Sequence, residues 1–213
     1  MRFAPATLAL ALLTLPHLPA LAHTACADSP LHLNEIMAGP ARDWDGSGLF
    51  SSRDDEWVEV VNVGLETLDL AGWLLTDGDN LPRYALAGAL APGDHRLVFG
   101  KDSYDWEKAH GYPAFGLSLA NSGDKVMLWQ VTGPDTTLMD SYAFASHEAA
   151  ADRASGRFPD GAGAWVLFDG LNPYTGTLLP AGNGCVPTPG APNGCSSTPA
   201  RPLSWGRLKS LYR

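Results

Sequence analysis

Short runs of β-branched, aromatic and aliphatic residues recur along the chain after residue 30, and turn-forming residues separate them. The runs cover residues 31–38, 56–63, 68–76, 83–86, 95–100, 125–131, 138–145 and 163–167. Turn signals such as Asp77-Gly78-Asp79-Asn80 and Pro92-Gly93-Asp94 stand between them. Regular short strands with little helical periodicity predict an all-β protein, built as a sandwich or barrel in a single domain.

Few segments depart from this pattern. Residues 104–110 and 147–153 are compatible with short helices in loops between strands. From Pro180 to Pro202 the chain consists mainly of Gly, Pro, Ser, Thr and Asn, which bury too little apolar area to order themselves without a cross-link. We therefore expect residues 180–200 to be a disulfide-closed segment and linker, and not a second domain.

Several strand and turn sequences together point to one family. They are Leu33-Asn34-Glu35-Ile36-Met37, Asp55-Glu56-Trp57-Val58-Glu59-Val60-Val61-Asn62, Leu70-Ala71-Gly72-Trp73-Leu74-Leu75-Thr76-Asp77, Leu90-Ala91-Pro92-Gly93-Asp94, Leu119-Ala120-Asn121-Ser122-Gly123-Asp124-Lys125-Val126, Arg157-Phe158-Pro159-Asp160-Gly161 and Thr188-Pro189-Gly190-Ala191-Pro192-Asn193. In this order and spacing the chain resembles the lamin-tail domain family, in its exported bacterial type. The resemblance implies an immunoglobulin-like β-sandwich, which we place over residues 31–179, and a binding or tethering role; a fold alone does not fix the function.

The first residues have the order of a secretory signal peptide. Arg2 precedes an apolar stretch from Ala6 to Leu15, and Ala20-Leu21-Ala22 offers a small-residue cleavage site. The apolar stretch is shorter than the ~20 residues that a membrane-spanning helix needs. We predict a signal peptide over residues 1–22, a leader over 23–30, and a secreted, periplasmic or cell-surface protein.

The charge balance limits the partners. With 14 basic residues against 23 acidic ones, the formal net charge is −9, and an acidic chain repels nucleic-acid phosphates. Nucleic-acid binding is disfavoured. Residues 201–213 differ, because they carry four basic residues and no acid, with Trp205 and Leu208 at helical spacing. This basic amphipathic tail has three interpretations: an export tag, a helix that contacts anionic membranes, or a frayed terminus.

The three cysteines fit an oxidising compartment. Cys185 and Cys195 stand ten positions apart in a Pro- and Gly-rich loop, where a disulfide forms easily, and we predict that they are bridged. Cys26 is left over. It is either a free or intermolecular thiol or a lipid attachment point that would bring the chain to a membrane.

The segment from Asp43 to Asp54 has the oxygen spacing of an EF-hand calcium loop. Oxygen ligands are offered by Asp43, Asp45, Ser47, the Leu49 carbonyl, Ser51 and Asp54, with Gly48 at the sharp turn. Ser47 and Asp54 replace stronger ligands, so we expect weak binding of Ca²⁺, with a Kd of ~10⁻⁴ to 10⁻³ M. The alternative is a solvated acidic loop.

No known catalytic motif is present in the sequence. There is no His-Glu-x-x-His zinc motif, no Gly-x-Ser-x-Gly elbow and no phosphate-binding glycine loop. We therefore predict a non-catalytic exported binding or tethering module for a protein or cell-surface ligand, stabilised by calcium. The rival prediction is an exported hydrolase, or a hydrolase accessory protein, with an unrecognised site; it requires two of His95, His110 and His147 to converge with a carboxylate.

Overall fold

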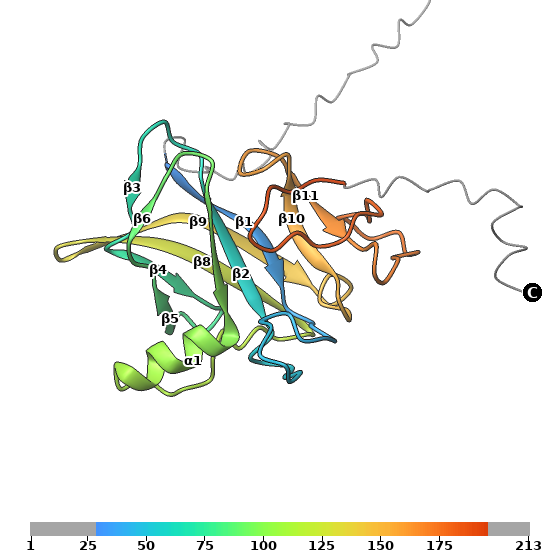
Figure 1. The fold of residues 1–213 in the computed structure, drawn as a ribbon, viewed down its shortest axis with the longest axis horizontal. Coiled ribbons are helices and arrows are strands. Elements are labelled where there is room, and N and C mark those ends of the chain that lie inside the picture. Colours follow the sequence, from blue (N-terminus) through green and yellow to red (C-terminus); the bar gives the residue numbers. More distant parts are fainter. Residues whose placement is uncertain (1–28, 196–213) are drawn as a thin grey trace, which may run out of the picture.

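A computed structural model describes residues 29–195, and these residues form two packed β-sheets with one short helix (Figure 1). The elements in chain order are β1 (Leu31–Met37), β2 (Trp57–Asn62), β3 (Leu68–Asp69), β4 (Trp73–Thr76), β5 (Pro82–Ala85), β6 (Ala89–Leu90), β7 (His95–Phe99), α1 (Gly100–Ala109), β8 (Gly123–Thr132), β9 (Asp135–Ala145), β10 (Ala154–Phe158) and β11 (Ala164–Phe168).

All named strands pair antiparallel. One sheet has five strands in the order β11-β10-β1-β2-β7, and a second has four in the order β5-β4-β8-β9; β3 and β6 form a small third pair. The two larger sheets pack face to face, with α1 below them in the view of Figure 1. The fold class is therefore an immunoglobulin-like β-sandwich, as the strand pattern and the family resemblance predicted.

The inner face of the five-stranded sheet forms the main core. Leu31 and Leu33 of β1 point into it and so does Ile36, because the register with β2 shifts between Leu33 and Glu35 and adds one residue. Val58 and Val60 of β2 meet Trp73, Leu75 and Leu128 from the opposite sheet. Alternate residues of β2 thus belong to the core between the sheets.

The outer face of the same sheet is also covered, and this was not expected. Met37, Trp57, Ala154 and Phe168 form a second buried cluster there with Cys185. Every residue of β2 is consequently buried, including Glu59. Part of the cover comes from the segment that follows β11, in which Cys185, Pro187 and Asn193 are buried while many of their neighbours are exposed.

Most predicted strands are confirmed to within a few residues. The predicted strand 68–76 is two strands, because Gly72 adopts a left-handed conformation (φ 83°) between β3 and β4. The helix predicted over 104–110 is α1, which begins earlier. The helix predicted over 147–153 is wrong: this segment is a series of turns, in which Arg153 binds the carbonyl oxygens of His147 and Asn172.

Two elements escaped prediction, and several predictions lie outside the described residues. The strands missed are β6 and β10; β10 holds Gly156, where a β-carbon would meet Phe168, Asn193 and Glu35. The signal peptide, Cys26 and the basic tail fall in residues 1–28 and 196–213. Among the helices of residues 29–195, none is long and apolar enough to cross a membrane.

Candidate metal site

The loop between β1 and β2 is anchored at both ends. At its start, the Trp44 indole packs edge-on against Trp57 and donates to Asp152 Oδ1 at 2.9 Å. At its end, the Lys101 N–H of α1 donates to the Asp54 carbonyl, and Gly100 leaves room for the Arg53 carbonyl, which a β-carbon would displace. The ends are fixed, whereas the middle of the loop faces solvent.

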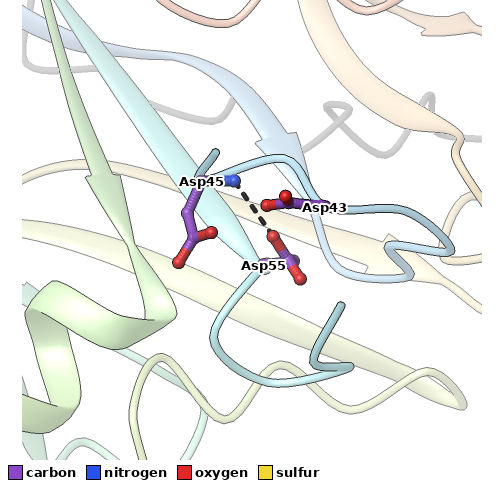
Figure 2. A group of neighbouring side chains, drawn as sticks. All are labelled: Asp43, Asp45 and Asp55. Carbon is purple, nitrogen blue, oxygen red and sulfur yellow. Dashed lines mark hydrogen bonds between the residues drawn. The ribbon is translucent and has the colours of Figure 1, made fainter. Parts of the chain in front are cut away.

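Three carboxylates of this loop gather in one place. Within residues 29–195, Asp43, Asp45 and Asp55 form the one group of His, Cys, Asp or Glu side chains whose ligand atoms all lie within 4.8 Å of one another (Figure 2). Asp43 is exposed and Asp45 half-buried, whereas Asp55 is fully buried. The cluster is therefore closed on the side of the buried Asp55 and open to solvent on the side of Asp43.

Asp55 is the carboxylate that shapes the loop. Its Oδ1 accepts the N–H groups of Trp44 (2.6 Å) and Asp45 (3.0 Å), and its Oδ2 accepts that of Ser51 (2.7 Å). These three bonds fold residues 44–51 back over the start of β2. Burial of this side chain is tolerated because backbone donors satisfy both of its oxygens.

The outer two carboxylates are held by the tip of the loop. The Ser47 N–H points at Oδ1 of both Asp43 (3.1 Å) and Asp45 (2.8 Å), and the Gly48 N–H donates to Asp43 Oδ2 at 2.8 Å. Gly46 and Gly48 both have positive φ (72° and 88°), which a side chain would strain. The glycines thus allow the turn that brings these acids together.

The predicted ligand set is brought together only in part. Asp43 and Asp45 are in the cluster, but the third carboxylate is Asp55 and not Asp54. Ser47 Oγ donates to the Leu49 carbonyl at 3.1 Å, and Ser51 Oγ accepts the Asp54 N–H, also at 3.1 Å. The sequence analysis chose Asp54 as the last ligand and missed Asp55, the next residue, which could have been chosen equally well.

The arrangement fits a hard divalent cation. Burial acts to raise the pKa of Asp45, but the hydrogen bonds from Ser47 and the charge of Lys101 outweigh it, so the pKa is lowered and the group is charged at neutral pH. A carboxylate has about four lone-pair sites, and the five backbone donors leave room for an ion. Oxygen ligands of this kind are the ones that Ca²⁺ prefers.

Asp55 and Asp54 can be distinguished by substitution. Asp55→Asn places an amide NH₂ where Asp55 Oδ2 now accepts Ser51 N–H, or where Oδ1 accepts two donors, and leaves a buried donor unpaired. We expect a loss of about 1–3 kcal/mol in the free energy of unfolding, measured by urea denaturation with or without calcium. Asp54→Asn is the matched control, with an expected change below about 0.5 kcal/mol; equal losses would remove Asp55 from its assigned role.

The three histidines of the hydrolase prediction have separate surroundings. His95 Nε2 lies 3.3 Å from Asp160 Oδ2, His110 stacks on Trp106, and the His147 ring lies 4.9 Å from that of Tyr174. None of them belongs to the acidic cluster found within the described part of the chain. No pair of them shares a partner in these contacts, so the geometry gives the hydrolase prediction no support.

The comparisons with known proteins agree with this architecture. Two packed antiparallel sheets are the architecture of the immunoglobulin-like class of domains. Within that class the chain belongs to the Lamin Tail Domain family, whose family model matches residues 24–146. Neither the search of curated proteins nor the search of solved structures finds a match. The family's immunoglobulin-like fold is consistent with a non-catalytic binding module.

Proposed function

We propose that the protein is an exported, non-catalytic binding module in which a calcium ion orders the β1–β2 loop and the recognition surface beside it. The observation that carries the proposal is the gathering of Asp43, Asp45 and Asp55 within 4.8 Å at the open side of a loop with fixed ends. Charges this close repel one another, and a divalent cation would convert that repulsion into attraction. The ligands would be these carboxylates, with Ser47 or Leu49 oxygens and water completing the shell.

Export is supported by the Cys185–Cys195 disulfide, which confirms the predicted pairing. Disulfides persist in oxidising compartments and are rare in the cytosol. The proposed location is therefore secreted, periplasmic or at the cell surface.

The recognition surface proposed is the tip of the same loop. Leu49 and Phe50 are 80% and 54% exposed and adjacent to the acidic cluster. Large apolar side chains presented together on a loop are typical contacts for a partner. An ion that fixes Asp43 and Asp45 would fix the position of these two side chains as well.

Calcium is expected to raise the melting temperature. With a Kd of ~10⁻⁴ to 10⁻³ M, 10 mM Ca²⁺ would stabilise the folded state by about 1.4–2.7 kcal/mol. For a chain of this size the melting temperature should rise by about 3 to 10 °C relative to chelator, as measured by calorimetry.

Matched variants separate the site from general charge effects. Asp43→Asn with Asp45→Asn should abolish the rise, whereas Asp54→Asn should keep it. Asp94→Asn with Asp135→Asn makes the same charge change at two exposed acids elsewhere and should also keep it. An unchanged melting temperature in the wild-type protein would show that calcium is not part of the function.

The binding role has its own test. Leu49→Ser with Phe50→Ser should reduce the fraction of labelled protein retained on intact bacterial cells in calcium by fivefold or more, at an unchanged melting temperature. Leu65→Ser is the control, because Leu65 is 92% exposed on a different loop. If the two variants bind cells equally, the tip of the β1–β2 loop is not the recognition surface.

A further inference from the structure

The chain after β11 returns across the outer face of the five-stranded sheet and ends in a disulfide-closed loop. Cys185 is buried against Met37, Trp57 and Phe168, and its carbonyl accepts the Gly170 N–H at 2.7 Å. Cys195, ten residues later, is exposed. The part of this loop from Thr188 to Asn193 is called the strap below. One end of this loop is thus fixed by packing, and the disulfide fixes the other.

The strap hydrogen-bonds to three acidic side chains. The Thr188 N–H donates to Glu35 Oε2 at 3.2 Å, and the Thr188 hydroxyl oxygen lies 2.9 Å from the same carboxyl oxygen. The Gly190 N–H donates to Glu59 Oε2 at 2.6 Å, and the Asn193 N–H to Asp160 Oδ1 at 2.7 Å. Asn193 also donates its side-chain amide to the carbonyl of Arg157 at 2.8 Å. Each contact joins the strap to a different strand or turn.

The sheet depends on these donors. Glu35 of β1 lies directly opposite Glu59 of β2 in the strand register, and both side chains are fully buried. Like-charged residues in that relation destabilise a sheet, and a buried carboxyl without partners is costly. Among the described residues, Thr188 supplies the hydrogen bonds to the Glu35 carboxyl, so removal of the strap would leave that group without a donor.

We propose that the Cys185–Cys195 disulfide is a redox-sensitive closure for the strap: when it is intact the strap covers Glu35 and Glu59, and when it is reduced the strap opens while the sandwich stays folded. The open form would expose the carboxyls of Glu35 and Glu59 to solvent, and the closed form covers them.

The chemistry is thiol–disulfide exchange. An external dithiol supplies two electrons and two protons to the Cys185–Cys195 bond and becomes a disulfide, and two cysteine thiols remain. Closing a loop of about ten residues restricts the open chain enough to change its equilibrium on the order of a hundredfold. That is sufficient to shift a short strap held by a few hydrogen bonds, and too little to unfold two packed sheets.

The charges around the two glutamates favour opening at higher pH once the disulfide is gone. Burial raises the pKa of Glu35 to about 8 and that of Glu59 to about 7. The charges that act on them are those of the carboxyl of Asp160 in the β10–β11 turn, which His95 of β7 contacts at 3.3 Å, and, for Glu35, of Glu59 itself. Arg157 of β10 points to the inner face, where it pairs with Asp140 of β9. The closed form therefore holds protons on Glu35 and Glu59 that solvent-exposed carboxyls would release, so a rise in pH favours the open form.

Hydrogen exchange of the full chain, with Cys26→Ser to prevent mixed disulfides, tests the proposal. In the oxidised protein the amides of Thr188, Gly190 and Asn193 should be protected. Dithiothreitol, and independently Cys185→Ser with Cys195→Ser, should accelerate their exchange on the order of a hundredfold, more at pH 9 than at pH 6. Amides of β4 and β8, which belong to the other sheet, should keep their protection.

Two results would overturn the proposal. Unchanged exchange at the strap after reduction would mean that the carboxylates hold it without the disulfide. Loss of protection in β4 and β8 together with the strap would mean that the disulfide stabilises the whole fold and closes nothing locally. Reduction in place by dithiothreitol gives the same readout if the double cysteine variant fails to fold.

Discussion

Replacement of Arg83 by methionine should lower the free energy of unfolding by about 3–5 kcal/mol, the loss typical of breaking a buried ion pair. The Arg83 guanidinium is almost fully buried between β5 and α1. It contacts Asp77 Oδ2 through Nε (2.8 Å) and Nη2, and Glu107 Oε1 through Nη1 (2.9 Å). Burial alone would lower the pKa of Arg83, but its hydrogen bonds with the two acids outweigh burial and raise the pKa, so the group stays charged. Without it, two buried acids lose their cation.

Urea denaturation of two variants would check this expectation. Arg96→Met is the control, because Arg96 donates its exposed hydrogen bond to the Ala87 carbonyl and has no buried acid to leave behind; its loss should stay below about 1 kcal/mol. Adding Asp77→Asn and Glu107→Gln to Arg83→Met should restore part of the stability, since neutral amides can remain without the cation. If Arg83→Met costs no more than Arg96→Met, the buried triad does not hold α1 on the sheet.

The spacing of acidic residues in the sequence predicted only part of the acidic cluster. The spacing from Asp43 to Asp54 placed two of the three clustered acids correctly, because Asp43 and Asp45 lie on one side of a glycine turn. It missed Asp55, since the chain turns between Ser51 and Asp55, whose N–H donates to the Ser51 carbonyl at 3.1 Å. That turn points Asp55, two residues before β2, back into the loop. The sequence alone does not reveal which acid of the Asp54-Asp55 pair points inward.

The outer face of the sheet could not be predicted for a different reason. Strand positions followed from apolar alternation, and the disulfide from cysteine spacing in a loop. The strap is polar and rich in proline, so its composition gives no sign of burial. A signal was nevertheless present: Glu35 and Glu59 stand among the core-forming residues of two strands, and a buried acidic residue needs a hydrogen-bonding partner. Glu59 has one partner on the neighbouring strand, Asn34, but the partners supplied by the strap, Thr188 and Gly190, lie more than 100 residues away in sequence.

Glu35→Gln is expected to flatten the pH dependence of stability between pH 5 and pH 8. The reason is that the Thr188 hydroxyl has a single proton but two neighbouring oxygen atoms that could accept it. This hydroxyl lies 2.9 Å from both Glu35 Oε2 and Asn193 Oδ1, and a hydroxyl has one proton to donate. The Asn193 amide is oriented by its own donation to the carbonyls of Asn34 and Arg157. Asn193 Oδ1 must therefore accept from Thr188, and Glu35 must be protonated and donate to the Thr188 oxygen.

The direction of the pH effect follows from the raised pKa. Burial raises the pKa of Glu35 from 4.5 to about 8, so the folded protein holds a proton that the unfolded chain releases. The stabilisation from this group is complete below pH 4.5 and is lost as the pH rises through 8. Glutamine keeps a donor for the Thr188 oxygen and an acceptor for the Thr188 N–H, with no proton to lose.

The variant should therefore reduce the slope of unfolding free energy against pH by up to about 1.4 kcal/mol per pH unit in this range, measured by urea denaturation at half-unit steps. Glu66→Gln is the control, because Glu66 is exposed on the β2–β3 loop and its neutralisation should leave the slope unchanged. Part of the slope should survive in Glu35→Gln, since burial also raises the pKa of Glu59 to about 7 and that of Glu56 to about 8. A slope identical to that of the wild-type protein would show that Glu35 is ionised beneath the strap, and the proton assigned to it at Thr188 would have to be placed elsewhere.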